Sequence, residues 1–404
     1  MRFAESVQYL LSLGHETLTI KLGLRNTELL LESLANPERS FPAVQIAGTN
    51  GKGSTAVMLD SICRAAGMKT GLYTSPHLVS ITERIQIAGE QISEEDFARH
   101  TATVRDASHR LLENKQIEAL PTFFEQLTAI ALLAFREAAI ELAILETGLG
   151  GRLDSTTAAN ASIVAITRIA MDHEQYLGQT IESIATEKAA IIRPGVTAVI
   201  GKQDPQALSV LMRRCEETRV QPIMATPPDA LIRLGLRGRH QLENAAIAIR
   251  VAENLSISRD AIMTGLETAH HPGRLELIPS EPPVLLDGAH NPAGCQALRH
   301  YLDEFVRRPL TLVFGAMSDK KLERIGEILF PLADNLILTA IENPRAASVE
   351  TLESIATRFA RGSITKSTTV TDAFSTALRI TPRHGMICVT GSLYLIGEWK
   401  QQHE

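Results

Sequence analysis

The chain has 404 residues, of which 44% are hydrophobic and 21% charged, and its formal net charge is −6. These proportions predict a globular protein of two or three domains and exclude a chain that is disordered throughout. The negative charge argues against a nucleic-acid partner bound through bulk positive charge. Aromatic residues, at 4%, are too few for base-stacking platforms.

Three features predict a cytoplasmic protein without a membrane partner. The longest apolar stretch, residues 129–135, is far too short to cross a bilayer. The N-terminal segment carries Glu5 and Gln8 where a signal peptide has an unbroken apolar run. The cysteines lie far apart without a CxxC pair or zinc-ligand spacing, which favours a reducing compartment over disulfides: Cys63, Cys215, Cys295 and Cys388.

The first two thirds of the chain alternates short β-branched apolar runs with longer helical periodicities. Strands are expected at 43–47, 70–73, 142–145, 163–167 and 196–200. Helices are expected near 52–66, 94–116, 122–138, 180–192 and 204–219. Apolar strands separated by helices predict an α/β domain of the phosphate-loop ATPase type, with a mostly parallel sheet covered on both faces.

A Pro-rich stretch at 278–283 interrupts this rhythm, and we expect it to be a linker. The alternation then restarts, with strands expected at 284–287, 310–314, 336–339 and 386–390. Helices are expected near 292–306, 320–329, 348–359 and 370–379. The sequence therefore predicts a domain of residues 1–277 and a smaller Rossmann-like α/β domain of residues 284–404, with substrates meeting in the cleft between them.

The sharpest local signal is a glycine-rich segment, VQIAGTNGKGST at 44–55, which joins a predicted strand to a predicted helix. Its glycines allow backbone N–H groups to converge on phosphate oxygens, and Lys52 adds a positive charge. The spacing departs from GxxxxGK[ST], because Gly53 intrudes after Lys52 and displaces the hydroxyl that usually binds magnesium. The alternative is an ordinary glycine-rich turn.

Three polar side chains follow predicted strands and are candidates to supply the missing magnesium ligands: Ser75, Glu146 and His173. A hydroxyl, a carboxylate and an imidazole around Mg²⁺ and phosphates suit phosphoryl transfer. Each also has a simpler explanation, as a turn former before proline, a strand-end charge or a loop histidine.

Taken together, the motifs resemble the folylpolyglutamate synthase/dihydrofolate synthase family, the folate branch of the Mur ligase superfamily. The resemblance spans nearly the whole chain. Its motifs are GTNGKGST at 48–55, TSPHL at 74–78, PTFFE at 121–125, GLGGRLD at 148–154, MDH at 171–173, EKA at 187–189, HQLENAA at 240–246, PGR at 272–274, DGAHNP at 287–292, DK at 319–320, PRA at 344–346 and VTGSLY at 389–394.

The resemblance implies an ATP-dependent ligase that adds L-glutamate to 7,8-dihydropteroate and to tetrahydrofolate polyglutamates through an acyl phosphate. The TFFE and RLD segments favour this bifunctional activity, and a synthase restricted to either acceptor is the nearest alternative. The expected partners are these small molecules, and the chain is expected to be a monomer.

The family's functional positions fall on matching residues of this chain. Catalysis is expected to depend on Lys52, Glu146, His173 and Lys188. Ser75, Glu146 and His173 match magnesium ligands, with two Mg²⁺ ions implied, and Lys188 matches a lysine carried as a carbamate. A monovalent cation is left open. The implied ATP contacts are Asn50, Gly51, Lys52, Gly53, Ser54, Thr55, Asn244, Arg274, Asp287 and His290.

The resemblance also implies a pteroate or folate site with an aromatic face for the flat ring. We expect one of Phe123 and Phe124 to be a core residue. The expected contacts are Leu22, Gly23, Leu24, Arg25, Thr122, Phe123, Phe124, Glu125, Arg152, Leu153 and Asp154.

Two more distant alternatives remain. A cell-wall Mur ligase would need a UDP-sugar domain, and we expect no room for one before the loop near residue 48. A binding module or regulatory ATPase without ligase activity is disfavoured because Lys52, Ser75, Glu146, His173 and Lys188 are all present.

Overall fold

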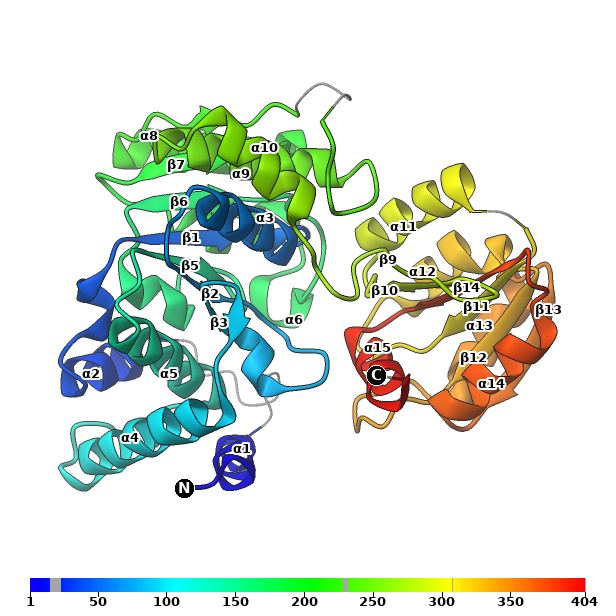
Figure 1. The fold of residues 1–404 in the computed structure, drawn as a ribbon, viewed down its shortest axis with the longest axis horizontal. Helices are drawn as coiled ribbons and strands as arrows, with labels where there is room; N and C mark the ends of the chain where they lie inside the picture. Colours follow the sequence, from blue (N-terminus) through cyan, green and yellow to red (C-terminus); the bar gives the residue numbers. More distant parts are fainter. Residues whose placement is uncertain (15–22, 228–231, 307, 404) are drawn as a thin grey trace. The chain divides into compact units, whose positions relative to one another are not determined.

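The computed structural model describes residues 1–14, 23–227, 232–306 and 308–403, which divide into two compact units. The first unit contains residues 1–235 and 242–269, and the second contains residues 236–241 and 270–404. Each unit is built around one sheet (Figure 1).

The sheet of the first unit has the strand order β4-β3-β2-β5-β1-β6-β7-β8. Six of these strands are parallel, and β3 and β4 pair antiparallel at one edge. The bounds are β1 Ala43–Ala47, β2 Thr70–Tyr73, β3 Ile85–Ile87, β4 Glu90–Gln91, β5 Leu142–Glu146, β6 Ile163–Ile166, β7 Thr197–Ile200 and β8 Ile223–Met224.

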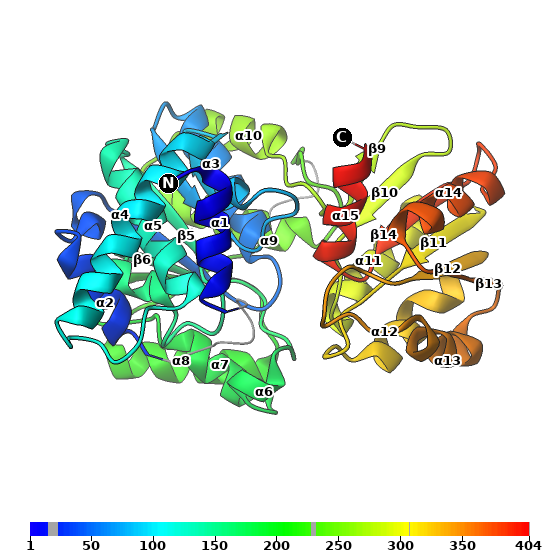
Figure 2. The ribbon, with the colours of Figure 1, turned by 90° about the horizontal axis from the view of Figure 1, so that it is seen from below.

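Helices cover both faces of this sheet, because its central strands are buried along their whole length. Figure 2 shows α3 and α10 on one side and α7 and α8 on the other. The bounds are α1 Phe3–Ser12, α2 Arg25–Ser33, α3 Lys52–Ala65, α4 Glu94–Glu113, α5 Phe123–Glu137, α6 Glu174–Leu177, α7 Ile181–Ala189, α8 Pro205–Thr218, α9 Gln241–Asn254 and α10 Arg259–Thr268.

The second unit has a six-stranded sheet in the order β13-β12-β11-β14-β10-β9, with only β9 antiparallel. Helices α12 and α13 lie on one side of it, and α14 and α15 on the other (Figure 2). The bounds are β9 Glu276–Ile278, β10 Val284–Asp287, β11 Leu310–Phe314, β12 Asn335–Thr339, β13 Ser363–Ser367 and β14 Met386–Thr390, with α11 Pro292–Phe305, α12 Leu322–Leu329, α13 Val349–Phe359, α14 Val370–Ile380 and α15 Leu393–His403.

The predicted fold class, two α/β units with mostly parallel sheets, is confirmed. The linker predicted at 278–283 is wrong. The prolines there join β9 to β10, which pair antiparallel within one sheet, and the division between the units falls at residues 269 and 270. Within the described ranges, no helix combines the length and apolar character needed to span a bilayer.

Candidate functional site

The glycine-rich segment forms a tight loop between β1 and α3, as the sequence predicts. Gly51 precedes the first residue of α3 with φ +88°, a backbone conformation that glycine adopts without strain. A Cβ on Gly48 would lie 1.9 Å from Thr167 Oγ1, so only glycine fits where the loop passes the end of β6. The N-terminus of α3 thus opens directly from the loop, the arrangement that favours anions.

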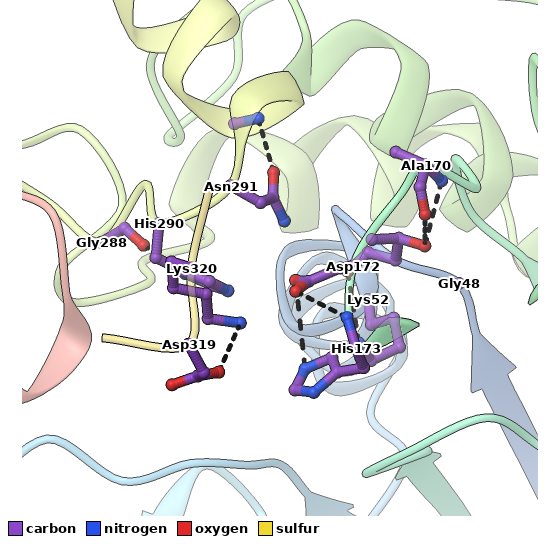
Figure 3. Close-up of polar contacts among 12 residues, drawn as sticks. Gly48, Lys52, Ala170, Asp172, His173, Gly288, His290, Asn291, Asp319 and Lys320 are labelled. Carbon is purple, nitrogen blue, oxygen red and sulfur yellow. Dashed lines mark hydrogen bonds and ion pairs between the residues drawn. The ribbon is translucent and has the colours of Figure 1, made fainter. Parts of the chain in front are cut away.

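The segment after β6 fastens this loop from one side. Thr49 and Asn50 donate their backbone N–H groups to the Arg168 carbonyl at 2.9 and 3.1 Å. The Thr49 hydroxyl donates to the Ala170 carbonyl and accepts from the Ala170 N–H, both at 3.0 Å (Figure 3). This clamp fixes the loop's shape before any ligand is bound.

Two lysines donate to the carbonyls of the same loop. Lys52 Nζ lies 3.4 Å from the Thr49 carbonyl oxygen, and Lys188 Nζ lies 2.8 Å from that of Gly48. Lys188 comes from α7 and is only 4% exposed. Burial, followed by the charge of Lys52, lowers the pKa of Lys188 from 10.5 to about 7. An appreciable fraction of this amine is therefore neutral near pH 7.

The other residues of this unit that are predicted to contact ATP lie in or beside the loop. Asn244 on α9 covers Gly51, since a Cβ there would lie 2.1 Å from Asn244 Oδ1. Gly53, Ser54 and Thr55 form the first turn of α3. Among the described residues, the buried Thr55 Oγ1 has no hydrogen-bond partner, so a ligand oxygen could satisfy it.

The structure brings Ser75 and Glu146 together at the ends of adjacent strands. Because β2 and β5 are parallel neighbours, both residues emerge at the carboxyl edge of the sheet. The Ser75 backbone N–H donates to Glu146 Oε2 at 3.1 Å. Glu146 is 5% exposed, so this carboxylate is placed at a buried strand end.

His173 stands at the start of α6 with φ +51° and is held by the preceding residue. Its backbone N–H donates to Asp172 Oδ1 at 2.9 Å, and its Nε2 lies 3.9 Å from Asp172 Oδ2 (Figure 3). Asp172 was not among the predicted site residues, although it is the middle letter of the MDH motif. The hydrogen bond fixes the backbone at His173, whereas the 3.9 Å separation of ring and carboxylate is longer than a hydrogen bond.

The donor set of Ser75, Glu146 and His173 fits a magnesium ion in chemistry, since oxygen ligands predominate. The described part of the chain has no group of three or more His, Cys, Asp or Glu side chains that could hold a metal ion. That result does not bear on this set, which has only two members of those types. The next residue, Thr147, has a buried Oγ1 without a hydrogen-bond partner among the described residues.

The TFFE segment begins α5 and divides as expected between core and surface. Thr122 and Glu125 form a reciprocal capping box. Phe123 is 3% exposed and belongs to the hydrophobic core. Phe124 is only partly buried, and its ring packs against Gly148, where a Cβ would lie 2.5 Å away. Phe124 is therefore the more exposed of the two rings, although it also packs against this core.

The neighbouring loop after β5 is held by Asp154. Its carboxylate accepts from the Leu149 N–H at 2.9 Å and from the Thr156 hydroxyl at 2.6 Å. Burial raises the pKa of Asp154, and these hydrogen bonds oppose the rise. Arg152 is more than half exposed and pairs with Glu187 at 3.0 Å, so it can reach a ligand without leaving a buried charge.

The structure gives little information on the predicted segment 22–25. Leu22 lies outside the described residues. Gly23 and Leu24 precede α2, and Arg25 is its first residue. No contact of these residues tests their assignment to the pteroate site.

The predicted nucleotide residues of the second unit lie on two neighbouring segments, one before β9 and one at the end of β10, which hydrogen bonds connect. Asp287 ends β10 and accepts N–H donation from Leu275 at 2.9 Å and from Ala289 at 3.0 Å. The Gly288 carbonyl lies 2.8 Å from His290 Nδ1 (Figure 3). Arg274 Nη1 donates to the same carbonyl at 3.4 Å. Burial raises the pKa of Asp287.

Comparison with known proteins matches both units. Residues 46–226 match the Mur ligase middle domain, and residues 273–393 match the Mur ligase glutamate ligase domain. The chain is 34% identical to the dihydrofolate synthase/folylpolyglutamate synthase of Bacillus subtilis, over 95% of each chain. It is also 34% identical to a probable bifunctional folylpolyglutamate synthase/dihydropteroate synthase of Halobacterium salinarum, over 98% of this chain and 51% of that protein. The chain thus spans about half the length of this relative and of its Haloferax volcanii counterpart.

Solved structures agree along the whole chain. The Mycobacterium tuberculosis folylpolyglutamate synthase complexed with ADP has a TM-score of 0.91 at 32% identity, over 99% of this chain and 98% of that one. Escherichia coli FolC in complex with DHPP and ADP has a TM-score of 0.89 at 29% identity, over 100% and 97%. A bifunctional folylpolyglutamate synthase/dihydrofolate synthase with Mn, AMPPNP and L-glutamate bound has a TM-score of 0.88 at 29% identity, over 100% and 98%.

Proposed function

Because the chain belongs to the dihydrofolate synthase/folylpolyglutamate synthase family of Mur-type ligases, we propose that it joins L-glutamate to 7,8-dihydropteroate and to tetrahydrofolate polyglutamates at the expense of ATP. The observation that carries the proposal is the phosphate loop, where Lys52 and Lys188 both donate to carbonyl oxygens. Two lysines so close to one loop suit a polyanionic ligand such as ATP. The relatives with bound ADP, AMPPNP, DHPP and L-glutamate support the same ligand set.

In the first half of the reaction, a carboxylate oxygen of the acceptor attacks the γ-phosphorus of ATP. The bond to the β,γ-bridging oxygen breaks, and an acyl phosphate and ADP are formed. Lys52 and the N-terminus of α3 offset the negative charge of the phosphates and hold them in line with the acceptor. Thr49 keeps the loop rigid through its contacts with Ala170, so the donors need not reorganise.

In the second half, the glutamate amine attacks the acyl carbon. The tetrahedral intermediate expels inorganic phosphate, and the amine loses a proton as the amide bond forms. A bound divalent cation would neutralise phosphate charge and polarise the transferred group. Ser75, Glu146 and His173 are the residues proposed to hold it, and Asp172 fixes the backbone at His173.

Lys188 is proposed to carry a carbamate, as the family resemblance implies. Carbon dioxide reacts with a neutral amine, and the pKa of about 7 leaves a large neutral fraction at pH 7. The product is an anion at the same position, which removes the repulsion from Lys52 and could help orient a second Mg²⁺.

The test is Mg²⁺-dependent phosphate release from ATP with L-glutamate, comparing 7,8-dihydropteroate with tetrahydrofolyl-monoglutamate as acceptors. Product mass checks that one glutamyl group is added. Release with both acceptors supports the bifunctional assignment, and release with one restricts it to that substrate. Folded protein that binds ATP but turns over neither acceptor would contradict the proposal.

The proposed setting is the reducing cytoplasm, and the proposed state is a monomer. All four cysteines are buried and free, which suits a reducing compartment. Sedimentation at micromolar concentration measures the oligomeric state, and a dimer there would contradict the second part.

A further inference from the structure

The turn that carries Arg274 is tied to the end of β10 along its whole length. The Gly288 N–H donates to the Gly273 carbonyl at 2.9 Å, and the Leu275 N–H donates to Asp287 Oδ2 at the same distance. Arg274 itself reaches across to the Gly288 carbonyl. The position of the guanidinium therefore depends on how residues 273–275 are held.

The next residue, Glu276, closes this turn from the other side. Its Oε2 accepts from the Gly273 N–H at 2.7 Å, three residues back in the chain. Its Oε1 accepts from Lys400 Nζ at 3.0 Å, in an ion pair that joins β9 to the C-terminal helix α15. One carboxylate thus links the backbone of the turn to a helix 124 residues away.

Both charges of this pair are withdrawn from water. The Glu276 and Lys400 side chains are 11% and 7% exposed. A buried ion pair contributes little net stability, because desolvation offsets the attraction, and apolar residues of similar size often serve as well. What an apolar pair could not supply is the acceptor for the Gly273 N–H. The pair is therefore better explained by the geometry it imposes on the turn than by stability.

We propose that Glu276 and Lys400 are positioning residues for the nucleotide, which fix the turn so that Arg274 presents its guanidinium to the phosphates. This inference rests on the proposed function, in which Arg274 contacts ATP. Lys400 holds the carboxylate of Glu276 in place, Glu276 holds the Gly273 N–H, and Gly273 sets the direction in which Arg274 leaves the backbone. Neither positioning residue needs to touch the nucleotide.

The test compares AMPPNP–Mg²⁺ binding by Lys400→Met in the wild-type and Arg274→Ala backgrounds. In the wild-type background, Lys400→Met should weaken AMPPNP binding about tenfold or more, the order of one lost charge-assisted hydrogen bond. In the Arg274→Ala background it should cost less than about twofold, because the group it positions is gone. Lys400→Arg keeps the charge and should retain most of the affinity.

The matched control is Lys366→Met, which removes an exposed lysine of the same unit that pairs with Glu353 at 2.9 Å. It should leave AMPPNP binding unchanged. If Lys400→Met does not fold, as judged by far-UV circular dichroism, Glu276→Gln replaces it: the amide oxygen can still accept from Gly273, but the ion pair with Lys400 is lost. The same weakening of AMPPNP binding, confined to the wild-type background, is expected, and its absence would overturn the inference.

Equal losses in the two backgrounds would overturn the inference, as would full affinity in a folded Lys400→Met variant. The proposed function fails separately, when the wild-type protein binds AMPPNP but releases no phosphate with either acceptor. In steady-state kinetics, the inference predicts a raised KM for ATP, with kcat changed much less.

Discussion

Replacing Lys188 with methionine should stabilise the protein at acidic pH while removing the proposed ligase activity. Lys188 is 4% exposed, and its surroundings lower its pKa from 10.5 to about 7. Below pH 7 the folded chain therefore holds a charged ammonium in a place that disfavours charge. Methionine fills a similar volume without that charge.

The size of the effect follows from the two pKa values. At pH 6 the lysine is protonated in both the folded and the unfolded chain, and the lowered pKa corresponds to about 5 kcal/mol of lost stability. At pH 9 the folded lysine is neutral, whereas the lysine of the unfolded chain is still protonated. This difference lowers the stability of wild type by about 2 kcal/mol. Methionine also loses the hydrogen bond to the Gly48 carbonyl, which costs about 1 kcal/mol at either pH.

The free energy of unfolding of the variant should thus exceed that of wild type by about 4 kcal/mol at pH 6 and by only about 1 kcal/mol at pH 9. Stability of the wild type rises between these pH values because the unfolded chain binds the proton that the folded chain has released. The difference in stability between the variant and wild type must therefore decrease as the pH rises.

Urea unfolding in CO₂-depleted buffer, followed by far-UV circular dichroism, measures this difference. Parallel pH dependence of wild type and variant between pH 6 and 9 would refute the reasoning, since it would mean that Lys188 carries no penalty of burial.

Four further substitutions separate binding, chemistry and packing. Glu146→Ala should lower turnover at least a hundredfold at unchanged melting temperature, and a fully active variant would remove the magnesium assignment. Gly51→Ala should weaken ATP binding, because its Cβ meets Asn244 Oδ1 and its φ is +88°, and equilibrium titration with AMPPNP measures the loss. Phe124→Leu should raise the acceptor KM and spare stability, whereas Phe123→Leu should lower the melting temperature and spare KM; the reverse pattern would exchange their roles.

The sequence predicted the fold well where burial decides the structure. The central strands of both sheets are buried along their whole length and are mostly apolar, and that pattern is visible in the sequence. Strand β13 was missed because its residues, SITKS, are polar and lie at an exposed edge. The prolines at 279–283 were misassigned as a linker, because a connection between paired strands and a linker between domains have the same composition.

Contacts between residues far apart in the chain limit how much of the site could be predicted from the sequence. The Gly-rich loop and the strand-end carboxylate carry local signals, so Lys52 and Glu146 could be identified from their neighbours in the chain. The pairing of Glu276 with Lys400 has no such signal, because β9 and α15 meet only after the sheet has formed. The low pKa of Lys188 was equally hidden, since it arises from burial and from the charge of Lys52.

The phosphate loop is an example of a site that costs the folded chain stability. Lys52 and Lys188 repel each other, and the repulsion lowers the pKa of Lys188. An architecture selected for stability alone would replace one of the two by an apolar residue. Keeping both becomes favourable only when negative charge enters, either as the phosphates of ATP or as a carbamate on Lys188. The same anions that the proposed reaction requires are therefore those that would relieve the electrostatic strain of the ligand-free loop, and binding of AMPPNP should raise the melting temperature of wild type more than that of Lys188→Met.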